Sequence, residues 1–109
     1  MNIGPYNLNS KVLLAPMAGT SDKPFRIICR ELGAALTTSE MVVLQKHLLN
    51  TNKSKHRLDF SSEKSPISIQ IAGSKAEELA ESARQAVEFG ADIIDINTVS
   101  YTHLRAHET

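Results

Sequence analysis

One glutamine stands where its side chain could bind a flat ligand. Gln70 lies in the run Ile67-Ser68-Ile69-Gln70-Ile71, where isoleucines alternate with polar residues, so Ser68 and Gln70 share one face of a predicted strand. In a free-standing sheet that face would meet solvent. Inside a barrel it faces the lumen, where a glutamine needs a hydrogen-bonding partner. A flat ligand whose edge carries paired donors and acceptors would supply that partner, because a carboxamide carries both.

A second candidate ligand-binding segment is the turn that follows the first long apolar run. Residues 11–15 are typical of a buried strand, and Pro16 ends it because proline has no N–H to give to a ladder. The small residues Ala18 and Gly19 let the backbone turn tightly and approach a flat or anionic group. Asp22 is placed to cap a helix that begins near Pro24.

These segments belong to a repeated strand–helix pattern. Apolar runs near residues 12, 35, 67 and 92 predict four strands, and the segments 24–32, 41–49 and 76–89 predict helices. Helices between successive strands indicate a parallel sheet, whose ligands bind at the carboxyl ends of the strands. A Rossmann fold is the competing architecture, but no Gly-x-Gly-x-x-Gly follows any strand. Residues 3–8 predict a short strand before the first unit, and a small hairpin closing the bottom of a barrel would fit there.

Composition limits the classes of function. The 109 residues are 41% hydrophobic and 22% charged, as in an ordinary soluble protein, and the formal net charge of zero gives no basic field for nucleic acid. The single cysteine, Cys29, cannot form an internal disulfide, which favours a reducing, cytoplasmic setting. It lies on the apolar stripe of a predicted helix, so we expect a packed thiol there. No apolar run is long enough for a membrane span, and residues 1–5 do not have the character expected of a signal peptide.

The sequence Leu-Ala-Pro-Met-Ala-Gly followed by Asp-x-Pro-Phe-Arg, together with a Ser-Glu-Met at residues 39–41, resembles the tRNA-dihydrouridine synthases, close to the bacterial branch called type B. The resemblance covers about the first 97 residues. It implies a flavin enzyme on a TIM barrel, in which Pro16, Met17 and Ala18 line FMN, Gln70 binds it and Asn97 lies beside it. Such a barrel needs about 250 residues. The fold class that we expect is therefore α/β: about four βα units, the incomplete N-terminal half of a (β/α)8 barrel, over residues 1–97.

The resemblance also implies the chemistry. In the family NADPH reduces FMN, the reduced flavin exchanges a hydride with C6 of a uracil extruded from tRNA, and a cysteine handles the proton at C5. That cysteine belongs to a Gly-Cys-Pro that follows the asparagine, whereas Ser100 occupies its position here and the glycine and proline are missing. A serine hydroxyl is too weak an acid to replace it. No catalytic residue is therefore assigned in this chain.

The last twelve residues, 98–109, resemble translated sequencing-adapter DNA and are expected to be a non-native tail. His103 and His107 are spaced as two metal ligands on one helix face, but no further ligand cluster accompanies them, so no metal site is predicted. The basic loop Lys53–Arg57 is either solvated surface or a contact for tRNA phosphates. Glu40 is either a flavin- or substrate-site carboxylate or a helix-start carboxylate.

Three alternatives stay open from the sequence. The first is another FMN-dependent barrel oxidoreductase of the dihydroorotate dehydrogenase kind, the second a non-catalytic binding fragment, and the third a fragment that assembles with a separate second half. The 109-residue chain is itself expected to be inactive, to bind no stoichiometric FMN and to aggregate through the open apolar edge of its fourth strand.

Overall fold

A computed structural model describes residues 1–40 and 60–98, and it begins with the expected hairpin. Strands β1 (Asn2–Ile3) and β2 (Tyr6–Asn7) pair antiparallel, and Gly4 between them has a φ of +54°. Leu8, Ile3 and Tyr6 pack against Ala35 and the amino-terminal residues of two later strands. The hairpin therefore covers the end of the sheet opposite the strands' carboxyl ends.

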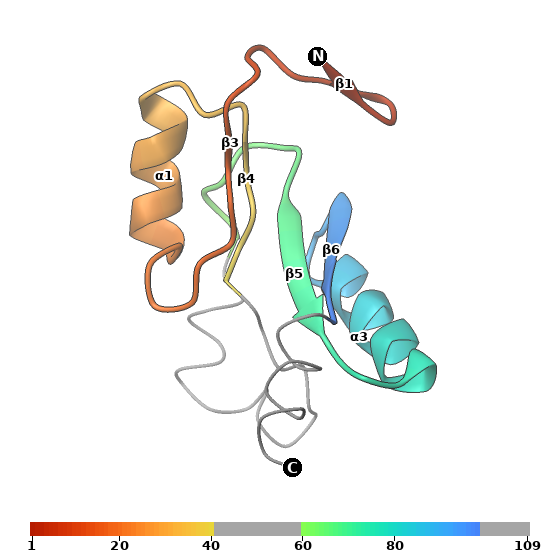
Figure 1. The fold of residues 1–109 in the computed structure, drawn as a ribbon. Coiled ribbons are helices and arrows are strands. Elements are labelled where there is room, and N and C mark those ends of the chain that lie inside the picture. Colours follow the sequence, from red (N-terminus) through yellow and green to blue (C-terminus); the bar gives the residue numbers. More distant parts are fainter. Residues whose placement is uncertain (41–59, 99–109) are drawn as a thin grey trace.

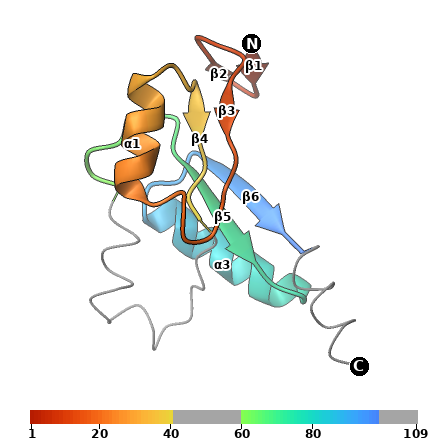
Figure 2. The same ribbon diagram turned by 60° about the vertical axis from the view of Figure 1, so that its left-hand side comes forward.

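Four parallel strands follow in the order expected from the sequence (Figures 1 and 2). Strand β3 (Leu13–Leu14) pairs with β4 (Leu36–Thr37), and β5 (Ser68–Ala72) pairs with β6 (Ile93–Asn97). A parallel bridge between Thr38 and Ser68 joins the two pairs. All four therefore point their carboxyl ends the same way. Within the described residues they form an open sheet, as four units of a larger barrel would.

Helix α1 (Lys23–Glu31) connects β3 to β4 and begins as the sequence predicts. Asp22 is its N-cap, and Oδ1 of Asp22 accepts a hydrogen bond of 3.1 Å from the Phe25 N–H. The helix ends at Glu31 with Leu32 as its C-cap, and Gly33 follows with a φ of +114°, which a residue with a side chain rarely adopts. Local capping signals thus set both ends of the helix.

Replacing Asp22 with alanine is expected to destabilise the protein by about 1 kcal/mol, because the Phe25 N–H at the start of α1 loses its acceptor. Asp22→Asn should cost only a fraction of that value, since its side-chain oxygen can still accept. Urea denaturation at protein concentrations low enough to prevent aggregation measures the difference between this chain and the two variants. Equal loss in both variants would assign the effect to charge rather than to capping.

Helix α3 (Ala76–Glu88) connects β5 to β6. The sequence Ser74-Lys75-Ala76-Glu77 predicts a capping box at its start. The N-cap is Lys75, which makes no side-chain capping bond, so the capping-box prediction is wrong. The apolar positions of this helix predict one buried face, but only some of them are buried. Ala86 is fully buried, and Leu79 and Ala83 pack on the core. Ala76, Ala80 and Val87 are exposed. Helix α3 therefore packs on the sheet through a narrower face than its apolar pattern predicts.

One core lies between α3 and the β5–β6 pair. Ile69 and Ile71 of β5 are fully buried against Ala86, and Phe60 closes the cluster. These isoleucines occupy the sheet face that α3 covers. The polar residues of β5 consequently occupy the opposite face, because side chains alternate along a strand.

The outer surface of α1 and β3 is apolar and exposed. Leu32 is 84% and Val12 63% accessible, and Ile28 and Leu13 are also exposed. Cys29 is half-buried in a hollow of about 250 Å³ between the strand and the helix, so the tightly packed thiol expected from the sequence is only half enclosed. At the other end of the sheet, Ile96 of β6 is exposed too. Both outer strands of the open sheet therefore carry apolar surface.

Several sequence predictions lie outside the described residues. They are the helix at 41–49, the basic loop Lys53–Arg57, the residue Ser100 and the pair His103 and His107.

Candidate functional site at the carboxyl ends of the strands

The predicted flavin-binding residues gather at the carboxyl edge of the sheet. Pro16, Met17 and Ala18 follow β3, Gln70 lies in β5, and Asn97 ends β6. Residues in register on neighbouring parallel strands point to the same face, and Ala72 pairs with Asn97. Gln70 and Asn97 therefore occupy the face turned away from α3. The topology places the β3 turn and Asn97 at the carboxyl end of the sheet, and Gln70 two residues before that end on the face that also carries Asn97.

Gln70 is 8% exposed and has two hydrogen-bonding neighbours. Its backbone N–H donates to the Ser39 hydroxyl at 3.2 Å, which fixes β5 against the segment after β4. Its side-chain Nε2 donates to Oδ2 of Asp95 at 2.7 Å. Asp95 is in register with Gln70 on β6. The buried carboxamide that the sequence analysis left without a protein partner has one.

The turn after β3 is closed by its own serine. The hydroxyl of Ser21, which is fully buried, accepts a hydrogen bond from the Met17 N–H at 2.8 Å and donates to the Met17 carbonyl at 3.1 Å. The N–H of Gly19 donates to Oε2 of Glu40 at 2.8 Å. Glu40 therefore joins the β3 turn to the end of β4, so the carboxylate lies at the candidate site. Ala18 lies at the exposed tip of the turn.

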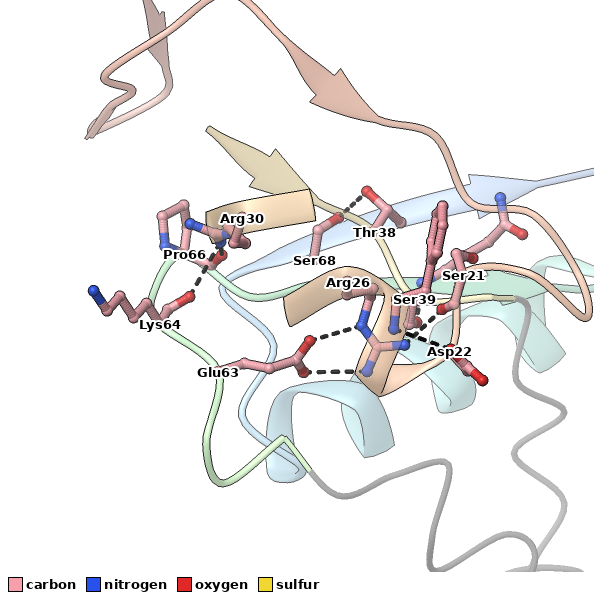
Figure 3. Close-up of polar contacts among 12 residues, drawn as sticks. Ser21, Asp22, Arg26, Arg30, Thr38, Ser39, Glu63, Lys64, Pro66 and Ser68 are labelled. Atoms are coloured by element: carbon pink, nitrogen blue, oxygen red, sulfur yellow. Dashed lines mark hydrogen bonds and ion pairs between the residues drawn. The ribbon is translucent and has the colours of Figure 1, made fainter. Parts of the chain in front are cut away.

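Below this turn, Arg26 forms a buried ion pair that is visible in Figure 3. The guanidinium donates from Nε to Glu63 at 2.7 Å and from Nη2 to the same carboxylate at 3.2 Å, while Nη1 donates to the Ser21 carbonyl at 2.7 Å. The Arg26 side chain is 3% and that of Glu63 10% exposed. The ring of Phe60 lies 5.3 Å from the guanidinium carbon. Arg26 thereby anchors the β3 turn to the segment that precedes β5.

A second arginine of α1 holds the same segment. Nη2 of Arg30 donates to the carbonyls of Lys64 and Pro66, the latter at 2.6 Å (Figure 3). Burial lowers the pKa of the Arg30 guanidinium, and the charge of Glu63 opposes that shift.

A further polar contact lies where the two strand pairs meet. The hydroxyl of Thr38, which follows β4, donates to the hydroxyl of Ser68 in β5 at 3.0 Å. Polar contacts therefore join β4 to β5 on the face that carries Gln70.

Sequence reasoning missed three parts of this arrangement. They are the Asp95 partner of Gln70, the two hydrogen bonds of the Ser21 hydroxyl to the Met17 backbone, and the burial of Arg26. The sequence did contain a signal for Asp95. Asp95 and Asn97 are two residues apart, and side chains alternate along a strand, so both lie on the same face of the sheet. Ser21 gave a weaker one, since a serine four residues after a turn start often bonds backbone. Arg26 gave none, because its partner lies 37 residues further along the chain.

Residues 1–40 and 60–98 contain no cluster of three or more His, Cys, Asp or Glu side chains able to hold a metal ion. No helix in that part of the chain is long and apolar enough to cross a membrane.

Comparison with known proteins adds independent evidence. The family model described as "Dihydrouridine synthase (Dus)" matches residues 13–98. The chain belongs to the dihydrouridine synthase family. That match begins at β3 and ends just after Asn97, so the four parallel strands and the candidate site all lie inside it.

Relatives within the dihydrouridine synthase family are similar over 97 residues, which is 89% of this chain. The chain is 54% identical to tRNA-dihydrouridine synthase B of Xanthomonas axonopodis, 52% to that of Pseudomonas aeruginosa and 46% to that of Escherichia coli. It spans only about three tenths of the length of these relatives.

The polar groups at and near the carboxyl ends of the strands suit a flat ligand with a hydrogen-bonding edge. Two carboxamides, Gln70 and Asn97, share the face opposite α3, and the small-residue turn after β3 exposes backbone at the same edge. Gln70 is held by protein contacts rather than by solvent. A carboxamide held in place by protein contacts, beside accessible backbone, suits a planar ligand whose edge carries hydrogen-bond donors and acceptors.

Proposed function

We propose that this chain forms the N-terminal flavin-binding part of a tRNA-dihydrouridine synthase, an enzyme of the cytoplasm. The observation that carries the proposal is the convergence of the β3 turn, Gln70 and Asn97 at one sheet edge inside the family match. The match to dihydrouridine synthases and the names of the relatives favour this enzyme over a dihydroorotate dehydrogenase-like oxidoreductase. The architecture proposed for the complete domain is the (β/α)8 barrel.

In this proposal FMN, reduced by NADPH, supplies the electrons that convert uridine in tRNA to 5,6-dihydrouridine. The residues of this chain bind and orient. Pro16, Met17 and Ala18 form the wall on one side of the flavin, Gln70 pairs with its pyrimidine edge and Asn97 lies beside it. Arg26 and Glu40 keep the β3 turn in place from below and from β4.

A chimera tests the proposal directly. Residues 1–97 of this chain replace the 97 aligned residues of the Xanthomonas axonopodis enzyme, and the product is expressed in a bacterium that lacks its own dihydrouridine synthases. We expect a yellow protein with about one FMN per chain and the return of dihydrouridine to the cell's tRNA. Visible absorbance measures the flavin, and mass spectrometry of tRNA nucleosides measures the product.

The matched control is the same chimera with Gln70→Met, which keeps the length of the side chain and removes the carboxamide. It should fold and hold well under one FMN per chain, with a raised Kd for FMN. A well-folded parent chimera that holds FMN and forms no dihydrouridine would contradict the proposed reaction, and one that holds no FMN would contradict the proposed cofactor site.

A further inference from the structure

Gln70 and Asp95 form a side-chain pair across the two central polar positions of β5 and β6. They are in register, so their side chains leave the sheet next to each other on the face opposite α3. Nε2 of Gln70 lies 2.7 Å from Oδ2 of Asp95, and Gln70 is 8% exposed. The main chain of Gln70 is held separately by the Ser39 hydroxyl. Both the backbone and the tip of this glutamine are therefore fixed by the protein.

The chemistry of the pair fixes which way the carboxamide faces. An ionised carboxylate only accepts hydrogen bonds, so Gln70 must turn its NH2 group toward Asp95. Its carbonyl oxygen Oε1 then faces away from Asp95, and the second N–H stays free to donate elsewhere. In an apolar or amide environment the same glutamine would present either atom. The carboxylate thus converts an ambiguous group into one with a defined acceptor position.

We propose that Asp95 is a positioning residue that orients Gln70, so that Oε1 and the second N–H of the carboxamide meet the imide edge of the flavin. The inference rests on the proposed function, since it takes FMN as the ligand. An imide edge presents an N–H flanked by carbonyl oxygens. The Oε1 of Gln70 can accept from that N–H, and the N–H beside Oε1 can donate to one of the carbonyl oxygens. Uracil carries the same edge, and the experiment separates the two ligands.

Asp95→Asn in the chimera tests the proposal, because asparagine keeps the size of the side chain but can offer either an oxygen or an NH2 to Gln70. The Kd for FMN, measured by quenching of flavin fluorescence, should rise about 10-fold. A second probe is FMN methylated at N3, which cannot donate to Oε1. The parent should prefer FMN over the methylated form, and Asp95→Asn should lose most of that preference.

Two matched variants separate orientation from simple weakening of the sheet. Asp92→Asn removes the other carboxylate of the same segment, which accepts hydrogen bonds from Ser65 and from the Ile67 N–H. It should keep the preference for FMN over its N3-methyl form even where stability falls. In a Gln70→Met background, Asp95→Asn should change the Kd for FMN no further.

The outcomes discriminate between the possible failures. If Asp95→Asn leaves both the FMN Kd and the N3-methyl preference unchanged, the inference is wrong. If it weakens the binding of uridine monophosphate and not that of FMN, the carboxamide of Gln70 binds the substrate uracil, and the inference is wrong as well. If the parent chimera holds no flavin, the proposed function fails, and the orientation is then judged from the Gln70 side-chain amide signals in 15N-labelled protein. Identical signals in the parent and Asp95→Asn would overturn it.

Discussion

Moving the junction of the chimera from residue 97 to residue 100 is expected to slow dihydrouridine formation by about 10²–10⁴-fold, the usual contribution of a positioned general acid. Ser100 then stands where the family resemblance places the catalytic cysteine. A cysteine thiol has a pKa of about 8.5, whereas an unactivated serine hydroxyl gives up its proton far less readily. The flavin content should stay near one per chain, because the proposed FMN residues are unchanged.

Two restored variants divide this loss into its causes. Ser100→Cys returns the acid alone, while Val99→Gly with Ser100→Cys also returns the small residue that precedes it in the family pattern. We expect partial recovery from the first and near-complete recovery from the second. The rate of single-turnover uridine reduction measures each. A serine chimera that is as fast as the cysteine form would remove the cysteine from the mechanism.

Replacing Arg26 with methionine is expected to lower the free energy of unfolding by about 3 kcal/mol, the second large effect. The Glu63 carboxylate, only 10% exposed, would lose the guanidinium that binds it through two nitrogens, and a buried charge without a partner is strongly destabilising. The Ser21 carbonyl and the ring of Phe60 would also lose their contacts with the cation. Urea unfolding of the chimera, followed by circular dichroism, measures the change.

The companion variants show whether charge or packing is responsible. Arg26→Lys keeps the charge but not the paired geometry, and it should cost less than Arg26→Met. The double variant Arg26→Met with Glu63→Leu should recover much of the lost stability, because no unpaired carboxylate is left behind. Additive losses in the double variant would show that the two residues do not act as a pair.

Features encoded by a few neighbouring residues were predictable. The start of α1 follows from Asp22, its end from Gly33, and the order of strands and helices from the spacing of the apolar runs. The alternation in β5 correctly placed Gln70 on the face away from the isoleucine core. Each of these depends on steric or hydrogen-bonding preferences that act within one turn or one strand.

Features that depend on distant partners were not predictable. A charged residue in the middle of an amphipathic helix normally faces solvent, yet Arg26 is buried because the segment before β5 brings a carboxylate to it. The pattern of α3 suggested a broad buried face, but the sheet covers only the part around Ala86. In β6 the contact of Asp95 with Gln70 depends on β5 lying beside it, so the local apolar pattern does not reveal it.

The exposed apolar surface of β3 and α1 has a consequence for how a protein of this family is made. In the eight-stranded parallel barrel proposed for the complete domain the first strand pairs with the last, so the open edge at Val12 and Leu13 would be closed only when the final strand has left the ribosome. Translation proceeds at about 5–20 residues per second, which leaves this surface in water for many seconds. The earliest part of the barrel to be synthesised is therefore the part that waits longest, and it is the natural place for a chaperone to hold the nascent chain.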